Sequence, residues 1–193
     1  VQIYYDDVEK LATTSSGIDV TGTVNGLNIT TTATSNIGLG ANAVDSITTG
    51  DYNVGIGDNA LTAVTTGTEN VAMGFEALKT HTTGHSNVAI GQESLENNTT
   101  ASNNTAVGTK SLRANTTGYN NVAIGYEAML SNTTGNGRNV AVGAGAMYTN
   151  TTGYESAALG YNALRAQTTG YMNTAIGTTA LQANTTGIEN TSV

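Results

Sequence analysis

Apolar and polar positions recur along the chain with a 17-residue period from Thr31 onward. Residues 116–132 show the pattern and read TTGYNNVAIGYEAMLSN. Because self-similarity at a fixed period is typical of repeat architectures, each unit is treated as one structural element. Complete units begin at Thr31, Thr48, Thr65, Thr82, Thr99, Thr116, Thr133, Thr151 and Thr168, and a partial unit covers residues 185–193. The unit beginning at Thr133 is longer than the others by one residue, which lies near Asn136.

Positions 7 to 9 of the unit predict a short strand. In residues 122–124 they read Val-Ala-Ile, which puts two β-branched residues on one strand face and a small residue on the other. We expect positions 7 and 9, with the apolar position 14, to point inward, and the small position 8 to let neighbouring chains approach closely. Position 10 is glycine in every complete unit, which ends the strand by permitting a positive φ. These glycines are Gly40, Gly57, Gly74, Gly91, Gly108, Gly125, Gly143, Gly160 and Gly177.

The rest of the unit predicts turns. Thr-Thr-Gly at positions 1 to 3 supplies a second turn, and asparagine at position 6 can bond to local backbone where the chain enters the strand. Positions 13 and 14 predict either a second extended piece or one helical turn. A long helix is excluded because glycine recurs too often. The asparagines singled out as structural positions are Asn53, Asn70, Asn87, Asn121, Asn139 and Asn173.

A 17-residue unit fits one coil of a solenoid. The sequence therefore predicts an all-β fold in which residues 31–193 form a parallel β-solenoid or β-roll of nine coils, each rising by roughly 4.8 Å. Residues 1–30 lie outside the repeat. Within them, residues 17–24 alternate apolar and polar positions, so this segment is predicted to be a β-rich connector or neck.

Composition supports thin, closely packed layers. The chain of 193 residues has 24 Gly but no Trp, Pro or Cys, so disulfides are missing and only Phe75 and nine tyrosines are available as aromatic anchors. Three apolar residues per coil bury little surface against the entropy of ordering a whole repeat unit. We therefore expect several chains to associate, with a homotrimer as the hypothesis.

Charge and hydropathy exclude two classes of partner. A net charge of −8 argues against binding to nucleic acid or to anionic lipid. No run approaches 18 apolar residues, so membrane insertion is not expected, and no signal peptide is visible at the start.

Several motifs suggest ligand sites, but none predicts one. Gly55-Ile56-Gly57 matches part of a dinucleotide fingerprint, yet no helix is predicted after it. His81 and His85 flank a predicted turn without a third ligand, so they are interpreted as surface histidines. No acid–base pair or nucleophile can be assembled. We therefore predict no catalytic, cofactor or metal site, and no enzyme.

Four sets of residues each share a position in the repeat. Stacked carboxylates at position 12 are interpreted as a solvated face: Glu76, Glu93 and Glu127. Asparagines at position 17 form sequons with the following Thr-Thr and are expected to form an amide ladder: Asn98, Asn115, Asn132, Asn150 and Asn184. Two rows of aromatic residues could either stack on sugar rings or pack between chains, and packing between chains is favoured. These residues are Tyr119, Tyr154 and Tyr171 at position 4, and Phe75, Tyr126 and Tyr161 at position 11.

The repeats resemble those of a known family. TTGYNNVAIGYEAML, TTGHSNVAIGQESL and TTGYMNTAIGTTAL are similar to the TTG-x-x-N-[VT]-A-[IV]-G-x-x-A-L repeats of bacteriophage tail fibres and related structural proteins. The N-[VT]-A-[IV]-G core is also similar to the shorter head repeats of trimeric autotransporter adhesins, which form parallel β-rolls in trimers. The resemblance implies a trimeric fibre and a location in the virion, or alternatively on a bacterial surface or outside the cell.

The resemblance favours one function over three others. We expect the structural shaft of a viral tail fibre or appendage, which projects a host-recognition tip while other parts of the full protein contact the host glycan or receptor. The alternative is an adhesin whose repeat surface itself binds host glycan or matrix. An ice-binding face is disfavoured because adjacent Thr-Thr points to opposite faces, and an enzyme comes last.

Overall fold

The chain divides into two compact units, Val1–Thr30 and Thr31–Val193. The computed structural model describes residues 2–5, 8–14, 17–20, 35–134 and 137–193. The first unit contains an antiparallel sheet in the order β1-β2-β3, formed by β1 (Gln2–Tyr5), β2 (Val8–Thr14) and β3 (Gly17–Val20). Of the strand predicted over residues 17–24, the first four residues form β3, and residues 21–24 lie outside the described part.

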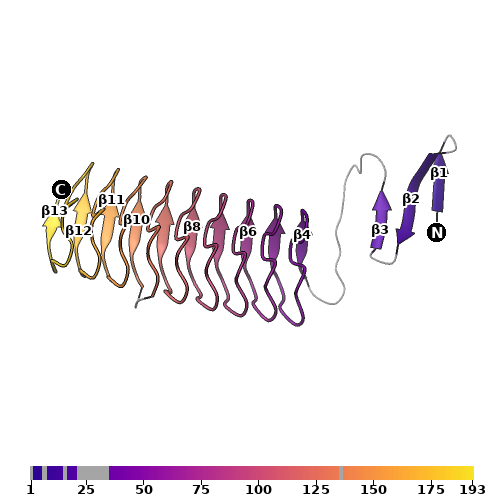
Figure 1. The fold of residues 1–193 in the computed structure, drawn as a ribbon, viewed down its shortest axis with the longest axis horizontal. Helices are drawn as coiled ribbons and strands as arrows, with labels where there is room; N and C mark the ends of the chain where they lie inside the picture. Colours follow the sequence, from indigo (N-terminus) through magenta and orange to yellow (C-terminus); the bar gives the residue numbers. More distant parts are fainter. Residues whose placement is uncertain (1, 6–7, 15–16, 21–34, 135–136) are drawn as a thin grey trace. The chain divides into compact units, whose positions relative to one another are not determined.

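The second unit is a parallel β-solenoid, which confirms the predicted fold class (Figure 1). Each coil contributes one short strand, and the strands pair in register, so that Ala72 lies opposite Ala89. The sheet runs through β4 (Ile37–Leu39), β5 (Val54–Ile56), β6 (Val71–Met73), β7 (Val88–Ile90), β8 (Thr105–Val107), β9 (Val122–Ile124), β10 (Val140–Val142), β11 (Ala157–Leu159), β12 (Thr174–Ile176) and β13 (Thr191–Ser192).

The remainder of each coil consists of turns, so neither alternative for positions 13 and 14 is present in the described coils. The Ala77 amide donates to the Gly74 carbonyl at 3.3 Å, and the His81 amide donates to the Leu78 carbonyl at 3.2 Å. Positions 5, 12 and 14 have positive φ even where they carry large side chains, as at Leu95 with φ 48°. These left-handed corners bend the chain sharply enough to close each coil within one repeat.

Backbone hydrogen bonds join neighbouring coils outside the strands as well as within them. The Thr65 amide donates to the Thr82 carbonyl at 3.0 Å, across the Thr-Thr-Gly corner. On the opposite side of the coil, the Leu78 amide donates to the Ser94 carbonyl at 3.0 Å. Stacking therefore satisfies backbone groups that a coil on its own would leave to water.

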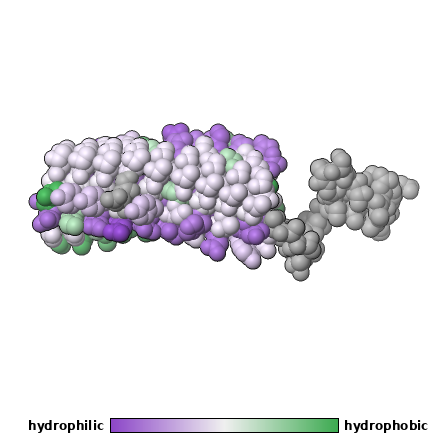
Figure 2. All heavy atoms as spheres, turned by 90° about the horizontal axis from the view of Figure 1, so that it is seen from below, coloured by the Kyte–Doolittle hydropathy of each residue, from purple (hydrophilic) through white to green (hydrophobic). Residues whose placement is uncertain are grey.

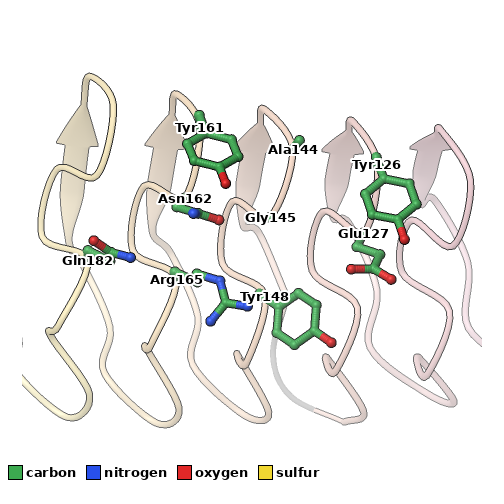
Figure 3. A pocket seen from close by; sticks show the side chains of 9 residues that line it. All are labelled: Tyr126, Glu127, Ala144, Gly145, Tyr148, Tyr161, Asn162, Arg165 and Gln182. Carbon is green, nitrogen blue, oxygen red and sulfur yellow. The ribbon is translucent and has the colours of Figure 1, made fainter.

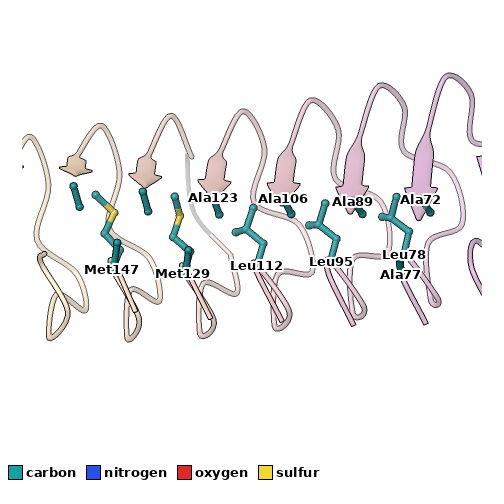
Figure 4. Packing of buried hydrophobic residues seen from close by; sticks show 14 of the residues in the cluster. Ala72, Ala77, Leu78, Ala89, Leu95, Ala106, Leu112, Ala123, Met129 and Met147 are labelled. Carbon is teal, nitrogen blue, oxygen red and sulfur yellow. The ribbon is translucent and has the colours of Figure 1, made fainter. Parts of the chain in front are cut away.

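The interior of the solenoid corrects one prediction. The small residue at position 8 points inward and is fully buried, as at Ala72 and Ala89, whereas positions 7 and 9 face outward. Position 8 packs against positions 13 and 14, so that alanines alternate with leucine or methionine along the core (Figure 4). The inward orientation of position 14 was predicted correctly; that of positions 7 and 9 was wrong.

The narrow interior explains this reversal. In β5, a Cβ added at Gly55 would lie 2.6 Å from Cγ2 of Val44 and 3.1 Å from the Ala60 carbonyl oxygen. At Gly55 the strand and the opposing turn therefore approach so closely that even a methyl group would clash, and in other coils the position is filled by a fully buried alanine such as Ala72. Valine and isoleucine must occupy the outer face because no space for them remains inside.

The position-10 glycines stack on one another at the corner after each strand. Gly91 has φ +129°, and a Cβ there would lie 2.6 Å from the carbonyl carbon of Gly108 in the next coil. Both the backbone conformation and the spacing of the coils therefore require glycine. At Gly177, φ is +125° but nothing lies within 4 Å of an added Cβ.

This contrast separates the two requirements. We expect Gly177→Ala, which meets only the backbone strain, to lower the free energy of unfolding by about 1–3 kcal/mol. Gly91→Ala adds a clash with the backbone of the next coil and should lower it considerably more, or prevent folding. Thermal melts followed by circular dichroism test this, and equal melting temperatures for the two variants would contradict the stacking argument.

Candidate functional site

The position-6 asparagines form a continuous amide ladder inside the solenoid. The Asn70 side-chain amide donates to Oδ1 of Asn53 at 3.0 Å and to the Gly84 carbonyl at 3.0 Å, while its backbone amide donates to Oδ1 of Asn53 at 3.1 Å. Asn87 repeats this arrangement one coil later, with Oδ1 of Asn70 as the acceptor. The buried side-chain amides therefore bond to neighbouring coils, whereas the sequence predicted only bonds to the local backbone. The ladder residues that were singled out are all buried: Asn53, Asn70, Asn87, Asn121, Asn139 and Asn173.

The ladder continues where the sequence departs from asparagine. The Asn173 backbone amide donates to Oγ of Ser156 at 3.1 Å. The Ser156 backbone amide in turn donates to Oδ1 of Asn139 at 3.1 Å. A hydroxyl therefore replaces the acceptor role of the carboxamide. This explains how the one exception at position 6 is accommodated.

A second, shorter ladder runs along position 17, as the sequence predicted. The Asn132 amide donates to Oδ1 of Asn115 at 3.0 Å, and the Asn150 amide donates to Oδ1 of Asn132 at 3.2 Å. These side chains are buried, as is that of Asn98, so the sequons there do not present an accessible amide. Asn184 is partly buried.

His81 occupies position 17 and is fully buried, so its interpretation as a surface histidine was wrong. Its Nε2 lies 2.9 Å from the Gly84 carbonyl and donates to it, whereas its Nδ1 has no partner among the described residues. Burial lowers the pKa of His81, a shift only partly opposed by the bond to the Gly84 carbonyl. His85 is exposed, as predicted. In the described part of the chain, no group of three or more His, Cys, Asp or Glu side chains is arranged to hold a metal ion.

The other motifs lie in ordinary parts of the coil. Gly55 and Ile56 belong to β5, and Gly57 forms the corner that follows, with a turn rather than a helix after it. At position 12, Glu76 forms an ion pair with Lys79 at 2.8 Å, and Glu93 forms one with the Arg113 guanidinium at 3.0 Å. Among the described residues, no helix is long and apolar enough to cross a bilayer.

The outer face of the strands carries two apolar rows along the solenoid. Position 9 is exposed by 38% at Ile90 and by 40% at Ile124, and position 7 is partly exposed in most coils. None of the strands from β4 to β12 contains a charged residue. Figure 2 views the solenoid from below, toward the corners that precede the strands, where the surface is mostly of intermediate hydropathy. The strand face is therefore a distinct apolar strip.

Aromatic side chains gather on the turns near the C-terminal coils. Tyr154 and Tyr171, both at position 4, stack with their ring centroids 4.8 Å apart and their planes 4° apart. Tyr126 and Tyr161 at position 11, with Tyr148 and Arg165 at position 15, line a groove of about 300 Å³ (Figure 3). The position-11 row was predicted from the sequence as a candidate binding surface, whereas Tyr148 and Arg165 were not. Aligning position 15 across the units would have revealed them.

Comparisons of the chain with protein-family models, with curated protein sequences and with solved structures found no match.

The buried histidine predicts a pH dependence of stability. Because the pKa of His81 is lower in the folded than in the unfolded chain, the unfolded chain binds more protons below about pH 6.5, so stability falls as the pH is lowered. We expect His81→Asn, which restores the commonest residue of position 17, to remove this component of the pH dependence. The measurement is the melting temperature between pH 7.5 and 5.5, with His85→Asn as the control. An unchanged slope in His81→Asn would contradict the prediction.

Proposed function

We propose that this chain is a non-catalytic structural shaft that associates with copies of itself through the outer face of its strands. The observation that carries the proposal is the apolar strip formed by positions 7 and 9 from β4 to β12. Its residues are apolar or threonine, most of them large, and they are at least partly exposed in the single chain. Such a continuous exposed surface is typical of an interaction site.

The dimensions of the strip support this interpretation. Nine coils at roughly 4.8 Å give a length of about 43 Å, and two rows of side chains give a width of roughly 10 Å. The resulting area of roughly 400 Å² is within the range of the largest apolar patches on monomeric proteins, which often mark binding sites. Covering the strip would also add the burial of valine and isoleucine that the narrow interior cannot provide.

A second copy of the chain is the partner that fits the strip best. The side chains on the strip recur once per coil, and only a surface with the same repeat presents knobs and gaps at matching intervals along its whole length. The lack of charge on these strands removes repulsion between identical surfaces, although the chain as a whole has a net charge of −8. The number of chains in the proposed homotrimer comes from the resemblance to trimeric fibres and adhesin heads.

The mechanical role follows from the stacking of the coils. Backbone hydrogen bonds and the asparagine ladder link successive coils on several sides, which favours a stiff spacer over a flexible linker. The resemblance of the repeats to tail-fibre sequences supports a location in a virion appendage as part of this proposal, with a bacterial surface as the alternative. In this proposal, contact with a host receptor belongs to other parts of the full protein.

Charge on the strip tests self-association. We expect the chain to form a three-chain species, and Ile90→Asp combined with Ile124→Asp to convert it to single chains, because each carboxylate would be buried without a partner. Thr83→Asp with Thr117→Asp, at exposed corner positions of the same two coils, is the matched control and should leave association intact. Light scattering after size-exclusion chromatography gives the mass. A single-chain mass for the unmodified protein would falsify the proposal.

The appendage role has a separate test in the organism or virus that encodes the chain. Antibodies raised against residues 35–193 should label a projecting fibre in electron micrographs of intact particles or cells. Deleting the coding segment should remove the fibre or its attachment. Labelling confined to the particle interior or to the cytoplasm would contradict a role as an external shaft.

A further inference from the structure

The groove near the C-terminal coils arises from a local departure from the repeat. Position 12 is glycine only at Gly145, and position 11 of the same coil is the small residue Ala144. The coils on either side carry Tyr126 and Tyr161 at position 11, and both side chains are more than half exposed, at 55% and 57%. Figure 3 shows the two rings flanking Ala144 and Gly145. The small residues therefore leave a gap between two exposed tyrosine side chains.

The gap spans two coils. Tyr126 and Tyr161 are two coils apart, which corresponds to roughly 10 Å at the spacing of parallel strands. Figure 3 shows both rings with their faces turned outward rather than toward each other, so their edges border the gap and their faces are open to solvent. By contrast, Tyr154 and Tyr171 lie in adjacent coils and stack directly at 4.8 Å, which leaves no space between them. The position-11 pair thus leaves its ring faces free to contact a ring from outside the chain.

Polar groups surround the gap on its lower side. The Arg165 guanidinium lies over the Tyr148 ring, 4.7 Å from its centroid, which fixes its orientation. The ion pairs among the described residues do not include Arg165. Asn162 and Gln182 add carboxamides, and Glu127 adds a carboxylate. Together they offer both donors and acceptors next to the two tyrosine rings.

We propose that this groove binds a pyranose ring of a neutral saccharide. A sugar ring has apolar C–H faces and a rim of hydroxyl groups. A C–H face would pack on the outward faces of Tyr126 and Tyr161, while the hydroxyls bond to Asn162, Gln182, Glu127 and Arg165. The groove combines aromatic side chains with several convergent polar groups, and its volume lies at the lower end of the range of small-molecule sites. The Glu127 carboxylate and the net charge of −8 disfavour an acidic sugar.

The groove is compatible with the proposed shaft but does not depend on it. Its residues lie at positions 11, 12 and 15, on the turns in front of the strands in Figure 3, whereas the apolar strip is the outer face of the strands themselves. The position-10 glycine corner lies between the two surfaces along the chain, since Tyr126 follows Ile124 after Gly125. Association through the strip would therefore leave the groove accessible, and a fibre of three chains would present it three times.

Titration with oligosaccharides tests the assignment. Neutral trisaccharides that present glucose, galactose, mannose and N-acetylglucosamine rings, with 3′-sialyllactose as an acidic comparison, would be added to the full chain and followed by saturation-transfer NMR and calorimetry. We expect at least one neutral sugar to bind with a millimolar or lower dissociation constant and the acidic sugar to bind more weakly. Lack of binding by every neutral sugar would overturn the proposal.

Variants locate the binding. Ala144→Tyr fills the gap with a residue that position 11 already accepts in the neighbouring coils, and Tyr161→Ala removes one of the two rings; each should weaken binding at least 10-fold. Phe75→Ala changes the same position in a coil outside the groove and should leave the affinity unchanged. Circular dichroism checks that all three variants are folded. Equal losses in Phe75→Ala and Tyr161→Ala would show that the groove is not the site, whereas the mass of the assembly tests the shaft separately.

Discussion

The structure of the solenoid depends on hydrogen bonds that each coil makes with the next at a fixed backbone spacing. Strand pairs such as Val71 with Val88 hold one side of the coil, and bonds such as Leu78 amide to Ser94 carbonyl hold the other. The same spacing lets Asn87 bond to Asn70 side chain to side chain. A parallel stack of this kind brings identical positions of the repeat together, so every row of the surface and of the interior is set by one position of the sequence.

The fixed spacing also limits what the interior can hold. The coil is thin, so alanine at position 8 meets leucine or methionine at position 14, and the larger β-branched residues lie outside. An interior of this kind buries little apolar surface per residue, and backbone and amide hydrogen bonds take a correspondingly large part in holding the coils together. The outer apolar strip and the tyrosine groove lie on different stretches of the coil, on either side of the position-10 glycine corner.

The period, the position-10 glycines and the strand at positions 7 to 9 were sufficient to predict a parallel β-solenoid from the sequence. The alternation of large and small residues did not predict which face of that strand is buried. A three-residue strand can bury either its central residue or the two residues beside it, and both choices fit the same pattern. Hydrophobicity favoured burying Val71 and Met73, but the width of the coil decided for Ala72. The burial of His81 was not predicted for a similar reason. Whether position 17 points inward depends on the conformation of the turns, which the sequence pattern did not determine.

The groove illustrates the same limit, because Tyr148 and Arg165 lie one repeat apart in the sequence and meet only through stacking. Stacking has a further consequence in the way such a chain can change over generations. Ser156 shows that a ladder continues through a substituted coil, and each coil offers its successor nearly the same contacts. Gain or loss of one whole repeat unit by recombination between similar gene segments would therefore leave every remaining contact intact, and the rod would lengthen or shorten in steps of one coil.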